Sequence, residues 1–195
     1  MSTSSSVSTA MVAFGPGAKL SPGAVQSDLS SSWPEVESPT TPEKSAGSVS
    51  FRVGDAHVSL GLMGAPIPGL TDRGGPCSKS WLWPDAQTEM RKHKTHCIVT
   101  VFADCEPIDR LTLLMQVTSA VAATCAQSVG LYWCDSNLVV SPEMFRDFSL
   151  DVLPSGLPLH VWINPRVGRR KDRRTGGFTP GMSSLGHTAM EPTNA

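Results

Sequence analysis

Apolar and polar residues alternate most regularly along the stretch SVSFRVGDAHVSLGLM, residues 48–63. If Gly54 and Asp55 form a two-residue turn, the apolar residues of the two arms pair on one face and the polar residues pair on the other. The predicted cross-strand pairs are Val53 with Ala56, Phe51 with Val58, Val49 with Leu60, Arg52 with His57, and Ser50 with Ser59. A shift of one residue would mix the two faces, so the pattern predicts a half-buried hairpin with a single register.

The rest of the chain is predicted to alternate between strands and helices. Strands are expected at residues 10–14, 95–103 and 157–167, with two more on either side of a turn at 135–137 within residues 129–140. Helices are expected at residues 21–33, at 84–93, from 106 onward and from 141 onward, where a capping residue or a proline precedes residues at helical spacing. The buried face of the helix after Glu106 is predicted to carry Ile108, Leu111, Met115, Ala122 and Cys125.

The order of these elements predicts the fold class. The first six elements, β-α-β-β-α-β, match the ferredoxin-like pattern, and the remainder can form a second similar unit that shares the strand at 95–103. The chain is therefore expected to be α+β, with helices packed on a largely antiparallel sheet. The predicted organisation is a disordered Ser/Thr-rich tail at 1–9, a single domain at 10–191 with a linker at 34–47 and a basic turn at 168–174, and a loose end at 192–195.

Length, charge and cysteine content limit the classes of function. A chain of 195 residues suits one domain, and a formal net charge of −1 predicts no general attraction to nucleic acid or to an anionic membrane. No stretch approaches the ~18 apolar residues of a membrane-spanning helix, and the first residues lack the basic start and apolar core of a signal peptide. We therefore expect a soluble cytoplasmic protein without membrane contact. The five cysteines are odd in number and irregularly spaced, which predicts free thiols.

The stretch GGPCSKSWLWPDA is the strongest candidate for a site. Cys77 lies a few residues before a predicted helix, where a thiol pKa can be lowered, and a nucleophile there would need His96 or His57 as its base. Packing is the commoner role of such a cysteine, and we favour it. Trp81 and Trp83 are candidates for a binding platform, although tryptophans at a loop–helix junction more often anchor the loop. We expect this stretch to be a plug that closes the fold.

A zinc site is the second hypothesis that the sequence raises. The stretch HKTHC at 93–97 contains three possible ligands, with Cys77 and Cys105 on either side in the chain. Structural zinc sites usually show two closely spaced ligand pairs, and no second pair is found here. The strand pattern also places Cys97 on the same apolar face as Val99. We therefore predict no metal and no cofactor.

The stretch GRRKDRR at 168–174 contains five basic residues and raises a third hypothesis. Arg169, Arg170 and Arg173 are candidates for binding phosphate groups, as in a weak nucleic-acid binder, or for a solvated hairpin tip. The net charge of the chain favours the solvated tip. The sequence contains no phosphate-binding loop, no dinucleotide-binding glycine motif, no Gly-x-Ser-x-Gly and no His-Glu-x-x-His. No catalytic residue is therefore predicted.

Several stretches occur in an order that resembles the bacterial DUF4261 family, a domain of unknown function. They are FRVGDAHVSLGLMGAPIP, GPCSKSWLWPDA, HCIVTV, VGLYWC, LPLHVWINPRV and GGFTPGMSSLGHTAME. The resemblance covers most of residues 10–191 and implies a soluble α+β domain with no established catalytic residues. Members of the family continue beyond the region similar to LGHTAME, and we expect this chain to lack that terminal part.

These observations favour a non-catalytic module that binds another protein through a loop and a sheet edge. A thiol-dependent enzyme centred on Cys77 with a histidine is the first alternative, and a weak nucleic-acid binder that uses the basic turn at 168–174 is the second. The absence of catalytic motifs favours the interaction module.

Overall fold

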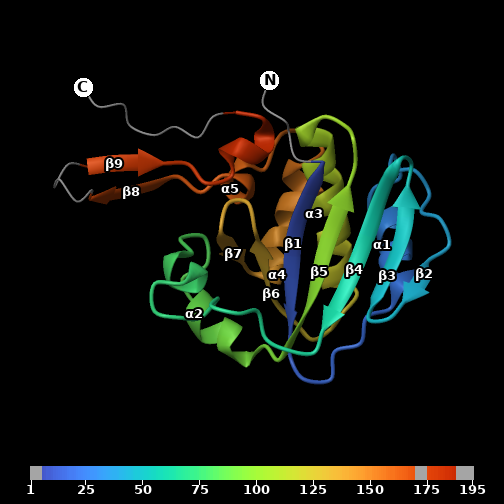
Figure 1. Ribbon diagram of the computed structural model, residues 1–195, viewed down its shortest axis with the longest axis horizontal. Coiled ribbons are helices and arrows are strands. Elements are labelled where there is room, and N and C mark those ends of the chain that lie inside the picture. The colour runs from blue at the N-terminus through green and yellow to red at the C-terminus, as the bar shows by residue number, and fades with distance from the viewer. Residues whose placement is uncertain (1–5, 170–174, 188–195) are drawn as a thin grey trace.

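Helices packed on a seven-stranded antiparallel sheet form the body of the molecule, as the computed structural model shows in Figure 1. The structure describes residues 6–169 and 175–187, with only the backbone for Arg169 and Thr175. The α+β class predicted from the sequence is confirmed.

The strands of the main sheet lie in the order β2-β3-β4-β5-β1-β6-β7, and all neighbours are antiparallel. Their bounds are β1 Val7–Phe14, β2 Glu43–Ser45, β3 Ser48–Val53, β4 Ala56–Met63, β5 Thr95–Phe102, β6 Ser128–Trp133 and β7 Leu138–Val140. A separate two-stranded hairpin consists of β8 Arg166–Arg169 and β9 Thr175–Phe178. The first strand in the chain therefore lies inside the sheet, between two strands that follow it by many residues.

The helical segments are mostly short. The α-helices are α1 Pro22–Ser32, α2 Ala86–Glu89, α3 Pro107–Ala123, α4 Pro142–Asp147 and α5 Leu159–Trp162. The 3₁₀ turns are η1 Pro76–Lys79, η2 Met90–Lys92 and η4 Met182–Leu185, and η3 Phe148–Val152 is a π-helical turn. Proline begins α1, α3 and α4, where a missing N–H removes no helical hydrogen bond.

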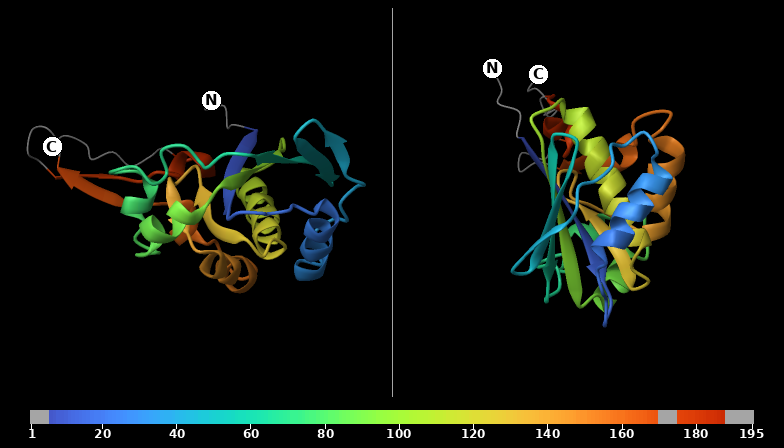
Figure 2. Two further views of the ribbon diagram at one scale, coloured as in Figure 1. Left: turned by 90° about the horizontal axis from the view of Figure 1, so that it is seen from below. Right: turned by 90° about the vertical axis from the view of Figure 1, so that its right-hand side faces the viewer.

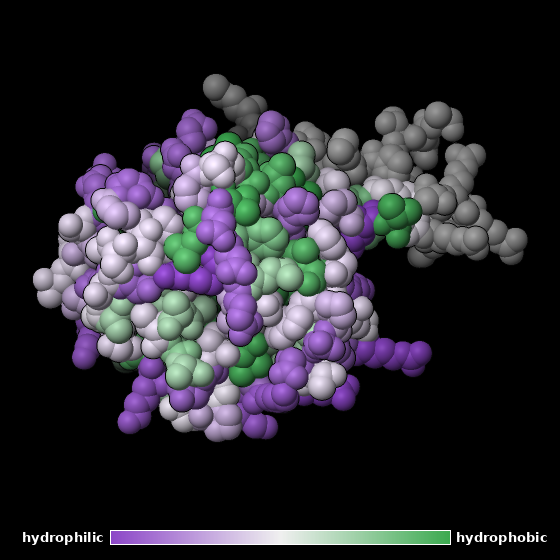
Figure 3. Space-filling view, turned by 180° about the vertical axis from the view of Figure 1, so that it is seen from behind, coloured by the Kyte–Doolittle hydropathy of each residue, from purple (hydrophilic) through white to green (hydrophobic). Residues whose placement is uncertain are grey.

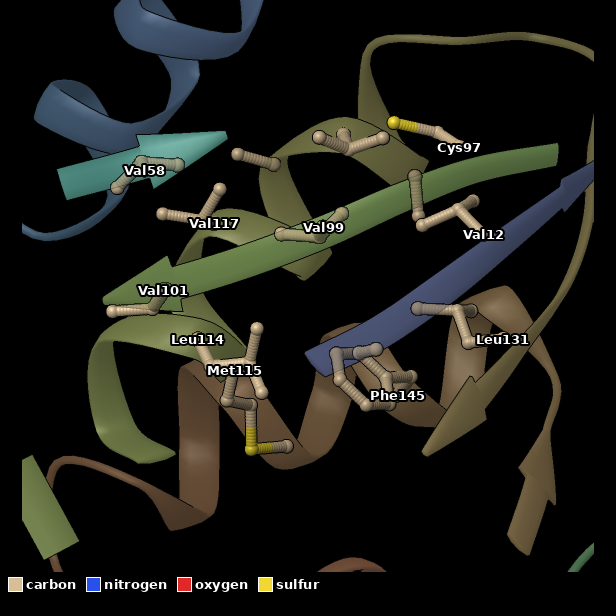
Figure 4. Close-up of a cluster of buried hydrophobic side chains, with 14 of the residues drawn as sticks. Val12, Val58, Cys97, Val99, Val101, Leu114, Met115, Val117, Leu131 and Phe145 are labelled. Atoms are coloured by element: carbon tan, nitrogen blue, oxygen red, sulfur yellow. The ribbon is translucent and has the colours of Figure 1, made fainter. Parts of the chain in front are cut away.

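One face of the sheet is covered by α1, α3 and α4 (Figure 2). Alternate residues of each strand point to this side, where they meet the apolar face of α3. Figure 4 shows Val99 and Val101 of β5 together with Val12 of β1 facing Leu114 and Val117 of the helix. Since α3 lies at the centre of this layer, most of its side chains are buried, which is more than the single stripe that the sequence predicted. Ile108 is an exception, because it is largely exposed, contrary to the prediction.

The β3–β4 hairpin has the register that the sequence predicts. All five expected cross-strand pairs are present, from Val53 opposite Ala56 to Val49 opposite Leu60. Gly54 adopts a φ of 55°, a left-handed conformation that glycine tolerates and that the tight turn requires. Phe51 is buried on the helix side, and Arg52 is exposed on the other side.

The strand order differs from a ferredoxin-like unit. In a βαβ unit the two strands are parallel, whereas β1 and β3 are antiparallel because β4 and β5 separate them in an antiparallel sheet. The parallel pair that a helix does connect is β5 and β6, which flank β1 and are joined by α3. The second unit is not formed, because residues 157–167 do not supply another strand to the main sheet.

Residues 157–167 were predicted to be a strand, and that prediction is wrong. They form α5 and the first residues of β8, which pairs only with β9 in the described part of the chain. Two further boundaries differ. Residues 7–9 of the predicted tail belong to β1, and the predicted linker at 34–47 contains β2. Residues 192–195 lie outside the described residues.

The opposite face of the sheet is covered over only part of its width. Residues 64–93, which connect β4 to β5, fold over β1, β6 and β7 and form a second small core there. Its buried members are Ala13, Ile67, Leu70, Cys77, Ala86, Met90 and Val139. This segment contains the GGPCSKSWLWPDA stretch and positions it beside the β8–β9 hairpin.

Candidate functional site

Two histidines hold the segment at 64–93 in place. The His93 ring is buried, its Nδ1 bonds to the carbonyl of Met90, and its Nε2 accepts the N–H of Ile67 at 2.8 Å. Both ring nitrogens are therefore used, and the acceptor role of Nε2 assigns the proton to Nδ1. His96 contacts the carbonyl of Ala65 through its Nδ1 at 2.7 Å. The two histidines therefore fasten a loop to the start of β5.

Cys77 lies inside this second core. Its side chain is 3% exposed, and its backbone N–H donates to the carbonyl of Leu70 at 3.1 Å. Burial raises the pKa of the Cys77 thiol to about 11, so the thiol keeps its proton at neutral pH. The histidine side chains proposed as its base have other contacts, because His96 bonds to Ala65 and His57 packs against Phe102. The geometry is that of a packing residue.

The possible zinc ligands at 93–97 are not brought together. Cys97 lies on the helix side of β5, where burial raises its pKa to about 12, whereas the adjacent His96 points to the other face. Within residues 6–169 and 175–187, no group of three His, Cys, Asp or Glu side chains is placed to hold a metal ion. Cys105 is exposed.

Trp83 anchors the loop to the sheet. Its ring is half-buried against the second core and lies over Gly130 of β6. A Cβ atom at Gly130 would lie 2.8 Å from Cζ3 of Trp83 and would also collide with the sulfur of Met90. Glycine at this strand position therefore provides the space that the tryptophan fills. The sequence analysis did not identify Gly130, although a glycine inside a strand is a known sign of close approach.

Trp81 has the opposite placement. Its side chain is 50% exposed, and its ring centroid lies 6.2 Å from that of His160 in α5. It forms one wall of a groove of about 420 Å³ between η1 and the β8–β9 hairpin. The groove is lined by Lys79, Trp81, Asn164, Pro165, Arg166, Val167 and Phe178. We call this the Trp81 groove. Its volume falls within the range of small ligand pockets.

The hairpin wall of the groove is fastened to the turn between β6 and β7. Arg166 donates through Nη2 to the carbonyl of Asn137 at 3.0 Å, and Asn164 donates through Nδ2 to the carbonyl of Ser136 at 3.1 Å. The backbone N–H of Asn164 donates to the carbonyl of Pro180, just before Gly181. Gly181 has a φ of 98°, and a Cβ atom there would collide with the backbone of Trp162. These contacts hold the base of the hairpin against the body.

Beyond this base the hairpin extends away from the body (Figure 1). Val167 is 79% exposed and Phe178 is 45% exposed, which is unusual for residues of these types in paired strands. Seen from behind, hydrophobic and hydrophilic side chains lie next to each other where the hairpin leaves the body (Figure 3). The combination is an exposed apolar surface with two cations, Lys79 and Arg166, and no carboxylate among the lining residues.

Only the first two residues of the basic turn predicted at 168–174 lie within the described part of the chain. Gly168 and Arg169 belong to β8, with the Arg169 side chain not described, and Arg170 and Arg173 lie outside the described residues. The groove therefore combines the Trp81 that the sequence analysis named with hairpin residues that it missed. Val167 and Phe178 could not be recognised as site residues from the sequence, because only the fold brings them close to a tryptophan more than eighty positions away.

Other hollows of the described part of the molecule lie beside the β2–β3 edge. One of about 530 Å³ lies beside β2 and β3 and is lined largely by polar residues, including Thr40, Glu43 and Arg52. Another, of about 320 Å³, lies between the start of α1 and the β2–β3 edge. Neither is lined by a tryptophan, and His57 is the one candidate site residue predicted from the sequence that lines either of them.

Comparison of the chain with protein-family models, with curated proteins and with solved structures finds no match. The site is therefore interpreted from its own geometry. None of the helices in the described ranges is both long enough and apolar enough to cross a membrane.

Proposed function

We propose that this protein is a non-catalytic, cytoplasmic interaction module that binds a partner protein through the Trp81 groove. The observation that carries the proposal is the exposure of Trp81, Val167 and Phe178 around one hollow. Tryptophan and arginine are the residues that most often dominate binding energy at protein interfaces, and both line this groove. A monomeric protein rarely exposes such side chains together without using them.

The environment of Cys77 supports a non-catalytic role. A thiol-dependent enzyme needs a thiolate with an adjacent base, and the raised pKa of the Cys77 thiol makes the thiolate scarce at neutral pH. The thiol is also buried in the second core, and Cys77 lines none of the hollows described above. These features favour binding over chemistry.

Membership of the DUF4261 family remains a proposal based on sequence resemblance. Two of the stretches that carry the resemblance, GPCSKSWLWPDA and LPLHVWINPRV, supply opposite walls of the Trp81 groove. The groove is therefore built by the parts of the chain on which that resemblance depends.

A photo-crosslinking experiment tests the proposed function. Benzoylphenylalanine at position 167, where the valine is almost fully exposed, is expected to form a discrete protein adduct in an extract of the cells that make the protein. The adduct should disappear when Trp81→Ala is introduced into the same chain. The control carries the crosslinker at Phe102, an exposed apolar position of β5 that lies outside the groove and is 42% exposed. Adducts that form equally at both positions, or that persist without Trp81, would contradict the proposal.

A further inference from the structure

Among the described residues, the β8–β9 hairpin consists of two strands, and no third strand pairs with it. Its four cross-strand pairs run from Arg166 opposite Phe178 to Arg169 opposite Thr175, and neither strand pairs with the main sheet in the described ranges. An isolated two-stranded hairpin is only marginally stable in water, and additional strands or packing are needed for independent stability. The N–H and C=O groups on the outer edge of β8 are a template for pairing with another strand.

The groove lies between η1 and the first residues of β8. Residues 164–167 line it consecutively, whereas β9 contributes only Phe178. Trp81 and Lys79 form the opposite wall. An extended segment that lies in the groove therefore runs alongside β8, with its backbone against the strand and alternate side chains towards the apolar surface of Trp81.

Asn164 adds an unsatisfied acceptor to the same wall. Its side chain is 1% exposed, and its two donated hydrogen bonds to Ser136 and Asn137 fix which atom of the amide is nitrogen. The opposite amide atom, Oδ1, has no hydrogen-bond partner among the described residues, and the same is true of Nε of Arg166. Both residues line the groove, and a ligand there that offers a donor and an acceptor would satisfy the two atoms.

The charged residues of the groove indicate the sign of the charge on that ligand. Lys79 and Arg166 are the ionisable residues that line it, and Lys79 has no ion pair within the described part of the chain. A second copy of this chain is disfavoured, because two-fold pairing along β8 would bring the same cations together. A negatively charged segment gains attraction at both positions.

We infer that the occupant of the Trp81 groove is an extended acidic segment of a partner protein, which adds as a third strand to the outer edge of β8. This inference rests on the proposed function and specifies its partner. An apolar side chain of the segment packs between Trp81 and Phe178, and its carboxylates face Lys79 and Arg166. A single-stranded nucleic acid fits less well, because such ligands need a run of cations along the backbone and a series of stacking rings, and the groove lining supplies two cations and two aromatic rings.

Synthetic peptides test the inference directly. The probe is a fluorescent nonapeptide of alternating glutamate and valine, measured by anisotropy against the full chain at low and high salt. We expect it to bind at least about tenfold more tightly than the matching lysine–valine peptide, a difference typical of one favourable charged contact. The backbone nitrogens of the peptide form two alternating sets, one of which faces β8. Methylation of that set should abolish binding, because its N–H groups pair with the strand. Methylation of the other set should have little effect.

Protein variants assign the peptide to the groove. Trp81→Ala should weaken peptide binding by about tenfold or more, and Phe102→Ala, an exposed aromatic residue outside the groove, by less than about twofold. Equal affinity for the acidic and basic peptides, no effect of backbone methylation, or tighter binding of an oligothymidylate would overturn the inference. If the Trp81-dependent crosslink at position 167 persisted in that case, the interaction module would stand and only the acidic-strand partner would be rejected.

Discussion

At the scale of single residues, the two tryptophans of the loop are separated by one position and have different roles. Trp83 fills the space above Gly130 and holds the plug on the sheet, whereas Trp81 projects into the groove. The sequence predicts that the two side chains differ in environment, since residues two apart cannot share a helix face. It does not predict which of them is buried, because that depends on a glycine more than forty residues downstream.

Trp83→Ala should lower the free energy of unfolding by about 2–3 kcal/mol, because it leaves a cavity against the second core. The cost is below that of a fully buried tryptophan, since Trp83 is only half-buried. Trp81→Ala should cost less than about 1 kcal/mol, because half of its side chain is already in water. Urea unfolding curves of both variants measure the difference. If Trp83→Ala unfolds like the unmodified protein, the residue does not anchor the loop.

Gly130→Ala should destabilise the protein, because the new methyl group meets Cζ3 of Trp83 at a separation of 2.8 Å. The same substitution should cost less in a chain that already carries Trp83→Ala, since the ring is then gone and only the flexible side chain of Met90 has to move. A double-mutant cycle should therefore give a coupling energy of about 1 kcal/mol or more between the two positions. Additive effects would show that the ring and the strand do not constrain each other.

At the scale of elements, the sequence predicts an element correctly where interactions between residues close in the chain determine its structure. The β3–β4 hairpin was predictable to the residue, because its register follows from a two-residue turn and an alternating pattern. Residues 157–167 were misread because Val161 and Ile163 alternate with polar or aromatic positions as in a strand. In the structure Val161 and Trp162 are adjacent and both buried, which suits a helical turn and not a strand with one buried face.

The hairpin provides a stability test at this scale. Phe51→Ala should cost about 3–5 kcal/mol, because the ring is buried against the helices. Arg52→Ala should cost no more than about 0.5 kcal/mol, because its contact with Asp55 is a surface ion pair of 3.8 Å between exposed side chains. Thermal or chemical unfolding measures both. Losses of similar size would contradict the register.

At the scale of the whole molecule, the groove could not be derived from the sequence. Its walls come from residues near 80, near 166 and at 178, and only the course of the chain over the sheet brings them together. The sheet order could not be derived either, because the pattern of β1 is equally compatible with a place at the edge or at the centre. The fold class could be predicted from the sequence, because it depends on the sum of many local patterns.

The cysteines predict how the whole fold responds to alkali. Burial raises the thiol pKa from an ordinary value near 9 to about 11 for Cys77 and to about 12 for Cys97 and Cys134. Below pH 9 the thiols are protonated in both the folded and the unfolded chain, so stability is unaffected. Between pH 9 and the raised values only the unfolded chain loses these protons, and the free energy of unfolding therefore falls as the pH rises. Unfolding curves at pH 8–11 should show this decrease.

Cys97→Ala should make that alkaline decrease smaller, because it removes one of the buried thiols, and Cys105→Ala should change it much less, because Cys105 is exposed. Both variants should be compared with the unmodified chain at the same ionic strength. An identical pH dependence in all three proteins would show that the buried thiol at position 97 does not titrate with unfolding.

The central place of β1 has a consequence for how the chain is made. Phe14 pairs with Thr95 and Ser128, so the first strand emerges from the ribosome about eighty residues before either neighbour exists. At ~5–20 residues per second, β1 waits for several seconds with both edges unpaired. The strands β2 to β4 can pair during this interval, but the sheet closes only when β5, α3 and β6 have been synthesised. A chaperone therefore contributes most by protecting β1 while both of its edges are unpaired, and less by stabilising the finished core.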